Sequence, residues 1–125
     1  MTKLCADEVL DEGLEYIQTN CNSMIACSGA PADYSGVASV ALADVAMSSG
    51  DFSIADGSGG ETGRTLTVAA KSSVTIDSSD TATHIVLVDT SGMLLLYVTT
   101  CDSLYLTAAQ TVDFPSWDIT LRDPT

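Results

Sequence analysis

Positive charge is what this sequence has least of. Four Lys and Arg residues stand against 17 Asp and Glu residues, so the net charge is −13. Phosphate backbones are bound mainly through Lys and Arg, and Lys3, Arg64, Lys71 and Arg122 are too few against this acidic background. We therefore expect neither a nucleic acid nor an anionic membrane as a partner. The acidic excess favours solubility and would attract a basic protein partner.

Long apolar runs and metal-binding cysteine spacings are missing as well. The first residues, MTKLCADEVLDEG, lack the apolar region of a signal peptide, and no run approaches the roughly 20 residues of a membrane span. Synthesis in a reducing cytoplasm is therefore expected. There is no CxxC pair and only one histidine, so we predict buried free thiols rather than a zinc site. The cysteines are Cys5, Cys21, Cys27 and Cys101.

Aromatic residues make up only 6% of the chain, so a core must come from Val, Leu, Ile and Ala. A chain of 125 residues predicts a single domain, residues 1–125. Its first part, about residues 3–19, carries apolar residues at helical spacing and predicts a helix with Thr2 as N-cap. The apolar face of this helix is Leu10, Leu14, Ile17 and Cys21.

From about residue 22 to residue 125 the pattern is typical of β structure. A strand in SMIAC is expected to lead into a loop, SGAPADYSG. The segment VASVALADVAM is ambiguous between helix and strand, and we favour a strand over about Val40–Met47. Further strands are expected in DFSIAD, RTLTVAA, SVTID, HIVLVD, MLLLYVTT, LYLTA, TVDF and WDITLRD. This predicts a mainly β fold: a β-sandwich or small barrel of short antiparallel strands with one N-terminal helix.

Two of these strands, HIVLVD and MLLLYVTT, are almost continuously apolar. Such strands are typical of burial on both faces or against another chain, so Ile85–Val88 and Leu94–Val98 are candidates for an oligomer core or a partner surface. The intervening DTSG predicts a tight hairpin with Gly92 at positive φ. Pro115 cannot donate to a β ladder and is expected at a strand edge or start.

Motifs for phosphate or calcium binding are incomplete. In GSGGETGRT, Gly57–Thr65, the second glycine of a phosphate loop would fall on Thr62, and the basic residue is Arg64 rather than lysine. A hairpin loop is the expected structure. In DFSIADGSGGE, Phe52 and Ile54 stand where a calcium loop needs oxygen ligands. Looser cation binding by Asp51, Asp56 and Glu61 stays open beside the simpler interpretation as solvated turn acids.

Side chains for catalysis are equally sparse. His84 is the only histidine, so any Ser–His–Asp triad would need it, and no GxSxG motif is present. A hydrolytic carboxylate pair is harder to exclude among 17 acids, but one Trp and four Tyr are few for a sugar-stacking cleft. We therefore predict no enzyme: no catalytic, cofactor-binding or metal-binding residue, and a structural or interfacial His84. The aromatic residues expected to anchor the core or an interface are Trp117, Tyr97, Tyr105 and Phe114.

Five segments in a fixed order carry a family resemblance: DFSIADG, GRTLTVAAKS, ATHIVLVD, LLLYVTTC and WDITLRDPT. With the N-terminal helix and the Cys-containing apolar segment, they resemble small virion proteins of tailed bacteriophages over about two-thirds of the chain, from Ala41 onward. The resemblance implies a structural protein of the virion, made in the host bacterial cytoplasm. Within that group we expect a head decoration, or cement, protein. The implied partners are the major capsid protein and copies of this chain, with a trimer favoured.

Two alternatives stay open. A tail or connector component, such as a tail-tube or adaptor subunit, would be present in far fewer copies per particle than a head-wide decoration protein. A small ligand-binding or glycan-binding β module would need a concave site lined by Trp117 and the tyrosines.

Overall fold

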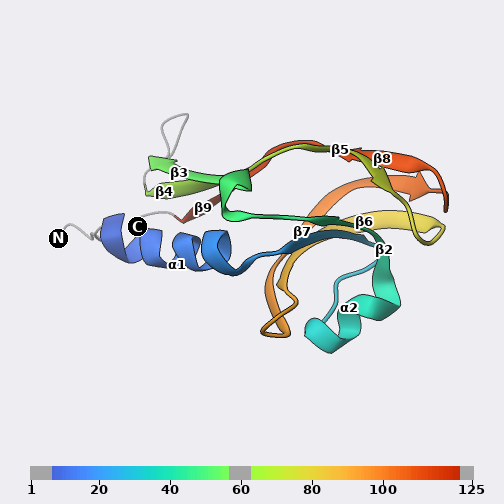
Figure 1. Cartoon of the computed structure of the whole chain (residues 1–125), viewed down its shortest axis with the longest axis horizontal. Helices are drawn as coiled ribbons and strands as arrows, with labels where there is room; N and C mark the ends of the chain where they lie inside the picture. Colours follow the sequence, from blue (N-terminus) through green and yellow to red (C-terminus); the bar gives the residue numbers. More distant parts are fainter. Residues whose placement is uncertain (1–6, 57–62, 122–125) are drawn as a thin grey trace.

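The computed structural model describes residues 7–56 and 63–121. The fold is mainly β, with several antiparallel sheets and one of its two helices near the N-terminus, which confirms the predicted class of a small β-sandwich (Figure 1). The helices are α1 (Asp7–Asn20) and α2 (Tyr34–Val40), with a 3-10 turn, η1 (Ser49–Asp51). The strands are β1 (Ser23–Cys27), β2 (Ala41–Ala46), β3 (Phe52–Asp56), β4 (Arg64–Val68), β5 (Lys71–Thr75), β6 (Asp80–Asp89), β7 (Leu94–Leu106), β8 (Thr111–Phe114) and β9 (Trp117–Leu121).

The larger sheet has the strand order β2-β1-β6-β7 and is antiparallel throughout. Its two central strands are the most apolar part of the fold, and Met24, Val86, Leu87 and Val88 have no exposed surface. At one edge, β2 approaches the second layer through a single bridge between Ala43 and Ile76. At the other edge lies β7.

The second layer is a ribbon built from β4 and β5 on one side and β9 and β8 on the other, with β3 added beside β4. Val68 pairs with Trp117 and Lys71 pairs with Phe114, so one register runs through both halves. The ladder is interrupted where Pro115, which has no N–H to donate, lies between β8 and β9. Pro115 therefore follows the end of β8 and does not start a strand, as the prediction of a strand edge or start allowed.

The larger sheet is covered on both faces. Towards the ribbon, Met24, Ala26 and Leu87 join residues such as Leu66 and Phe114 in the main core. Towards α2, Ile25, Cys27, Val86 and Val88 pack around Val37 in a second cluster, and Figure 1 shows α2 on the opposite side of the sheet from β5 and β8. Because consecutive residues of β1 and β6 point to opposite faces, two apolar environments explain their unbroken apolar sequence. The prediction of burial on both faces is confirmed for Val86, Leu87 and Val88, and the cover comes from the chain itself.

Helix α2 corrects the prediction of a loop before β2. Its sequence, YSGVASV, is a weak helix former. Asp33 caps it by accepting the Gly36 N–H at 2.9 Å, and Val37 is buried against the sheet. A cap and one tertiary contact therefore outweigh local propensity here, and the strand expected from Val40 begins at Ala41.

Helix α1 packs on the end of the fold formed by β3 and β4 (Figure 1). Leu14 is 1% exposed and Cys21, just beyond the helix, is 3% exposed, while Ile17 is half-buried. The Arg64 Nε donates to the Asp11 Oδ1 at 2.7 Å and ties β4 to the helix. These contacts confirm the expected helix and its inner face. Thr2 and the side chain of Leu10 lie outside the described parts of the structure.

The connection from β6 to β7 differs from the expected hairpin. The Asp89 carboxylate accepts the N–H groups of Ser91 and Gly92 at 3.0 and 3.1 Å. The positive φ falls on Met93, at 53°, rather than on Gly92, so that prediction was wrong. Glycine is needed at position 92 because an added Cβ would lie 2.8 Å from the Asp89 Oδ2. After this turn β7 runs unbroken to Leu106, which merges the expected MLLLYVTT and LYLTA strands.

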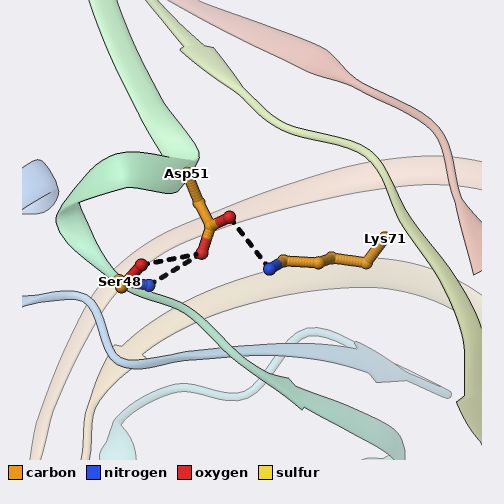
Figure 2. A network of polar contacts seen from close by, with 3 residues as sticks. All are labelled: Ser48, Asp51 and Lys71. Carbon is orange, nitrogen blue, oxygen red and sulfur yellow. Dashed lines mark hydrogen bonds and ion pairs between the residues drawn. The ribbon is translucent and has the colours of Figure 1, made fainter.

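A small polar network joins η1 to the start of β5. Figure 2 shows the Lys71 Nζ reaching the Asp51 Oδ1, at 2.9 Å, while the other Asp51 oxygen accepts the Ser48 N–H at 2.8 Å. The ion pair with Lys71 is the chief reason why the pKa of Asp51 is lowered. Asp51 therefore holds η1 and the start of β5 together, rather than taking part in a cation loop.

We expect Lys71→Met to lower the free energy of unfolding by about 0.5–1 kcal/mol at neutral pH, because it removes a partly buried ion pair. The lowered Asp51 pKa contributes stability above the unfolded value of about 3.9, and this is lost as the pH falls through the folded value. Chemical denaturation at pH 7 and pH 2 measures the effect. The difference between the two proteins should shrink at pH 2, and an undiminished difference would contradict the assignment.

Two carboxyl groups meet where β2 approaches β5. The backbone N–H of Asp77 donates to the Leu42 carbonyl at 2.7 Å, which places Asp77 beside Asp44. A side-chain hydrogen bond with Asp77, and then burial, raises the pKa of Asp44. Both residues are exposed. The pair is thus a local source of like-charge repulsion at neutral pH.

Asp44→Asn should increase the free energy of unfolding at pH 7 by no more than about 0.5 kcal/mol, since water screens exposed charges. A raised folded pKa stabilises fully below the unfolded pKa and loses that contribution as the pH rises through the folded value. The gain should therefore vanish near pH 3. Asp118→Asn, which removes an exposed charge on β9, is the control. A loss of stability at pH 7 in Asp44→Asn would refute this explanation.

Candidate interaction surface

Strand β7 leaves one of its edges open. It is 13 residues long and pairs with β6 alone; no strand or backbone hydrogen bond in the described residues reaches its other side. Exposed edge strands present unpaired N–H and C=O groups and are ready templates for another strand. Exposed apolar side chains lie along this strand and its preceding turn: Met93 at 70%, Leu94 at 41%, Leu104 at 56% and Tyr105 at 63%. Bulges and charged side chains are common ways to blunt such an edge, and β7 has both around Asp102, but the edge stays unpaired in the described residues and keeps these apolar side chains exposed. It is therefore the first candidate for a working surface.

An irregular bulge, with three residues opposite one, bends the second half of β7. Thr100 pairs with His84 and Leu104 pairs with Ala82, so the three residues Cys101–Ser103 stand opposite Thr83 alone. Extra residues in one strand bend it and redirect its side chains. The bulge therefore turns a short polar segment, CDS, towards the space between the two layers.

That space is a cavity of about 360 Å³ at the open edge of the sandwich. Two small side chains of the larger sheet, Ala26 on β1 and Ala82 on β6, are part of its lining. Its walls are Cys101–Leu104 from β7, Val112–Phe114 from β8 and the following Pro115, with Phe114 3% exposed. The cavity exists because alanines face it from β1 and β6, where Leu or Val would fill the gap between the layers. Its volume is within the range of sites that take a small ligand or a large side chain.

The polar residues Asp102 and Ser103 contribute to the lining of the cavity, and both are exposed. Asp113 also belongs to the lining, but it alternates on β8 with Val112 and Phe114, which face the core, so its side chain points to the other face of the ribbon. The Asp113 Oδ1 accepts the Ser73 N–H at 2.9 Å. Among the described residues the cations are Arg64 and Lys71, and these pair with Asp11 and Asp51 respectively. The cavity therefore combines an apolar interior with negative charge, and would favour an apolar group flanked by positive ones.

The four aromatic residues singled out in the sequence separate into two sets. Phe114 is buried in the core, and Tyr97 and Trp117 contact each other across the layers with ring centroids 5.9 Å apart. The Trp117 Nε1 is buried without a hydrogen-bond partner. Tyr105 instead points into solvent from the β7 edge. Core anchoring is confirmed for Phe114, Tyr97 and Trp117, whereas Tyr105 belongs to the exposed surface.

The side chains considered for catalysis do not converge within the described chain. His84 lies on β6 between Cys27 and Thr100, and its Nδ1 meets the Thr83 hydroxyl at 2.8 Å. The Asp44–Asp77 pair is on the surface and does not line the cavity between β7 and β8. No three His, Cys, Asp or Glu side chains in residues 7–56 and 63–121 are placed to hold a metal ion.

The two glycine-rich motifs fall largely on residues that are not described. Residues 57–62, which include Glu61 and most of the segment tested as a phosphate loop, lie outside the structure, as does the side chain of Asp56. Arg64 and Thr65 begin β4, so the segment leads into a strand. Cation binding by Asp51, Asp56 and Glu61 therefore stays untested apart from Asp51, which pairs with Lys71.

The two strands that were predicted to contact a partner differ in their exposure. Val86, Leu87 and Val88 have no exposed surface and are covered by the chain itself, so they are not available to a partner. Ile85 is half-buried and lines the cavity, so a partner contact stays a prediction for this residue. Leu94–Val98 is only partly covered and lies on the open edge. Sequence reasoning missed the cavity, because a bulge and the approach of β8 are tertiary features. The one local signal was the polar CDS segment that interrupts an apolar strand.

The thiols test this geometry. Cys21 and Cys27 are buried, and burial raises the pKa of Cys27 to about 11, whereas Cys101 is half-buried in the cavity wall. In a Cys5→Ser background, N-ethylmaleimide should modify Cys101 in the native protein and leave Cys21 and Cys27 unmodified until denaturant is added. Burial and the nearby Asp102 also raise the pKa of Cys101, so its reaction should be slower than that of a free thiol. Peptide mass spectrometry measures each site, and native labelling of Cys27 at the rate of Cys101 would contradict the structure.

No described helix is long and apolar enough to cross a membrane. Comparisons with known protein families, with curated proteins and with solved structures find no match to this chain. The feature of the described residues that bears on function is an open edge strand beside an apolar cavity with Asp102 in its lining.

Proposed function

We propose that this protein is a non-enzymatic interaction module whose working surface is the open edge of β7 and the adjoining cavity. The observation that carries the proposal is the 13-residue edge strand with exposed Leu94, Leu104 and Tyr105 beside an open cavity. Apolar groups kept at the surface of a small acidic domain favour contact with another macromolecule. Adhesion needs such a surface and no reacting group.

We further propose, from the sequence resemblance, that the protein decorates and stabilises the outside of a tailed-bacteriophage head. Its partners would be the major capsid protein and further copies of itself, with a trimer as the expected assembly. A capsid lattice displays the same contact many times, so weak individual contacts become strong in combination. A small β module with an adhesive edge suits this role.

The alternatives differ in what they require. A tail or connector component could use the same edge, and only its copy number would differ. A glycan-binding module needs aromatic side chains around a concave site. The cavity is lined by one aromatic residue, Phe114, and by neither Trp117 nor a tyrosine. A structural role in the virion is therefore better supported than a glycan-binding role.

Quantitative protein analysis of purified virions that carry this gene tests the role. A head decoration protein should be present in proportion to the major capsid protein and should be released by mild disruption before the shell opens. A single ring of copies would indicate a connector instead. Absence from the particle would overturn the virion role altogether.

Attachment should also depend on salt. Copies with a net charge of −13 repel one another, so we expect positive contact patches on the shell and a contact that added salt screens. The fraction of protein retained on particles should fall when NaCl is raised from 0.05 M to 0.5 M. Constant occupancy across this range would remove the electrostatic part of the proposal.

A further inference from the structure

We propose that the open edge of β7 binds an extended segment of a partner protein by β-strand addition, with an apolar side chain in the cavity and Lys or Arg side chains against Asp102. The identity of this partner as a capsid subunit rests on the proposed function. The binding mode rests on the structure of this chain alone.

The backbone of β7 supplies the first part of the argument. A strand within a sheet pairs on both sides, whereas β7 pairs only with β6 in the described structure. An added strand would satisfy the free N–H and C=O groups without requiring the sandwich to change shape. The main-chain pairing would give affinity for an extended segment, and the side chains at this edge would decide which segment binds.

The cavity beside β7 can hold a side chain of the bound segment. It opens between β7 and β8, and Ala26 and Ala82 are part of its lining. Side chains of an added strand alternate between the two faces of the sheet, so every second one would face the ribbon and one of them would enter the cavity. Leu104, 56% exposed and part of the cavity wall, would be covered by such a side chain. We therefore expect a large apolar residue, Phe or Leu, at the centre of the bound segment.

Charge decides between a different partner and a second copy. Asp102 contributes to the cavity wall, and neither β7 nor β8 contains a Lys or Arg residue. A symmetric pairing of two β7 edges would place Asp102 from both copies in one interface, and like charges facing each other disfavour association. A segment with basic residues two positions before and after its apolar residue would instead bring opposite charges together. The occupant is therefore a basic extended segment of another protein.

Synthetic peptides provide the probe. The first has a central Lys-Thr-Phe-Thr-Lys sequence with Thr on either side, because residues two positions apart share a face of the strand. Matched peptides replace both Lys by Glu, or Phe by Ala. Binding to the full chain is followed by fluorescence anisotropy and by amide chemical shifts. We expect the Lys peptide to bind at least about tenfold more tightly than either matched peptide, with shifts concentrated at residues 101–106 and 112–114.

Backbone methylation tests strand addition itself. The amide hydrogens of an extended segment alternate in direction, so only one alternate set can face β7. N-methylation of that set should abolish binding, and N-methylation of the other set should leave it within about threefold of the parent peptide. Equal tolerance of both sets would overturn β-strand addition.

Protein variants test the acidic side chains. Asp102→Lys should reverse the preference, so that the Glu peptide binds more tightly than the Lys peptide. Asp118→Lys makes the same change on β9, away from the cavity, and should keep the original preference. Ala82→Leu should fill the cavity and weaken the Phe peptide; if it fails to fold, the peptide series and Asp102→Lys still decide the matter.

Several results would overturn the inference: equal affinity for the Lys and Glu peptides, shift changes remote from β7 and β8, or dimerisation of the free protein through β7. Virion attachment separates this inference from the proposed function. If wild-type protein and Asp102→Lys occupy particles equally and no peptide binds, the edge inference fails and the virion role stands. If the peptides bind as expected but particles lack the protein, the virion role fails and the edge inference stands.

Discussion

The structure depends on burial of the central strands of one sheet on both of their faces. β1 and β6 place Met24 and Leu87 against the ribbon and Ile25, Val86 and Val88 against the side covered by α2. This double burial uses the most apolar sequence in the chain for stability. It also leaves β7 at the rim, because the ribbon and α2 cover the faces of the sheet but not this edge. The exposed surface is thus a consequence of how the core is closed.

Charge is distributed in keeping with that arrangement. Arg64 joins β4 to α1 through Asp11, and Lys71 joins β5 to η1 through Asp51. The described cations therefore work within the fold, while acids such as Asp102 and Asp113 face outward. An acidic surface keeps copies apart and selects a basic partner. The same property that favours solubility would give the β7 edge its specificity.

The sequence predicted most of the fold, because period-two alternation and continuous apolar runs report directly on strands and their burial. It placed the start of β2 within one residue and offered burial on both faces as one of two explanations for the apolar run that ends in the buried residues Val86, Leu87 and Val88. It failed where tertiary contacts decide: α2 depends on the Asp33 cap and on Val37 against the sheet, and the role of Gly92 depends on its distance from Asp89. The sequence predicted only one part of the candidate surface. Leu94–Val98 was identified from its apolarity, but the cavity needs a bulge opposite Thr83 and the approach of β8, neither of which leaves a local pattern.

Hydrogen exchange of backbone amides tests the central claim most directly, namely that β7 is an unpaired edge to which another strand can bind. In the free protein, amides of β6 should be protected, whereas alternate amides of β7, those that point away from β6, should exchange rapidly. In the protein bound to its partner the same alternate amides should become protected. Uniform protection of β7 in the free protein, or unchanged exchange on attachment, would contradict the account.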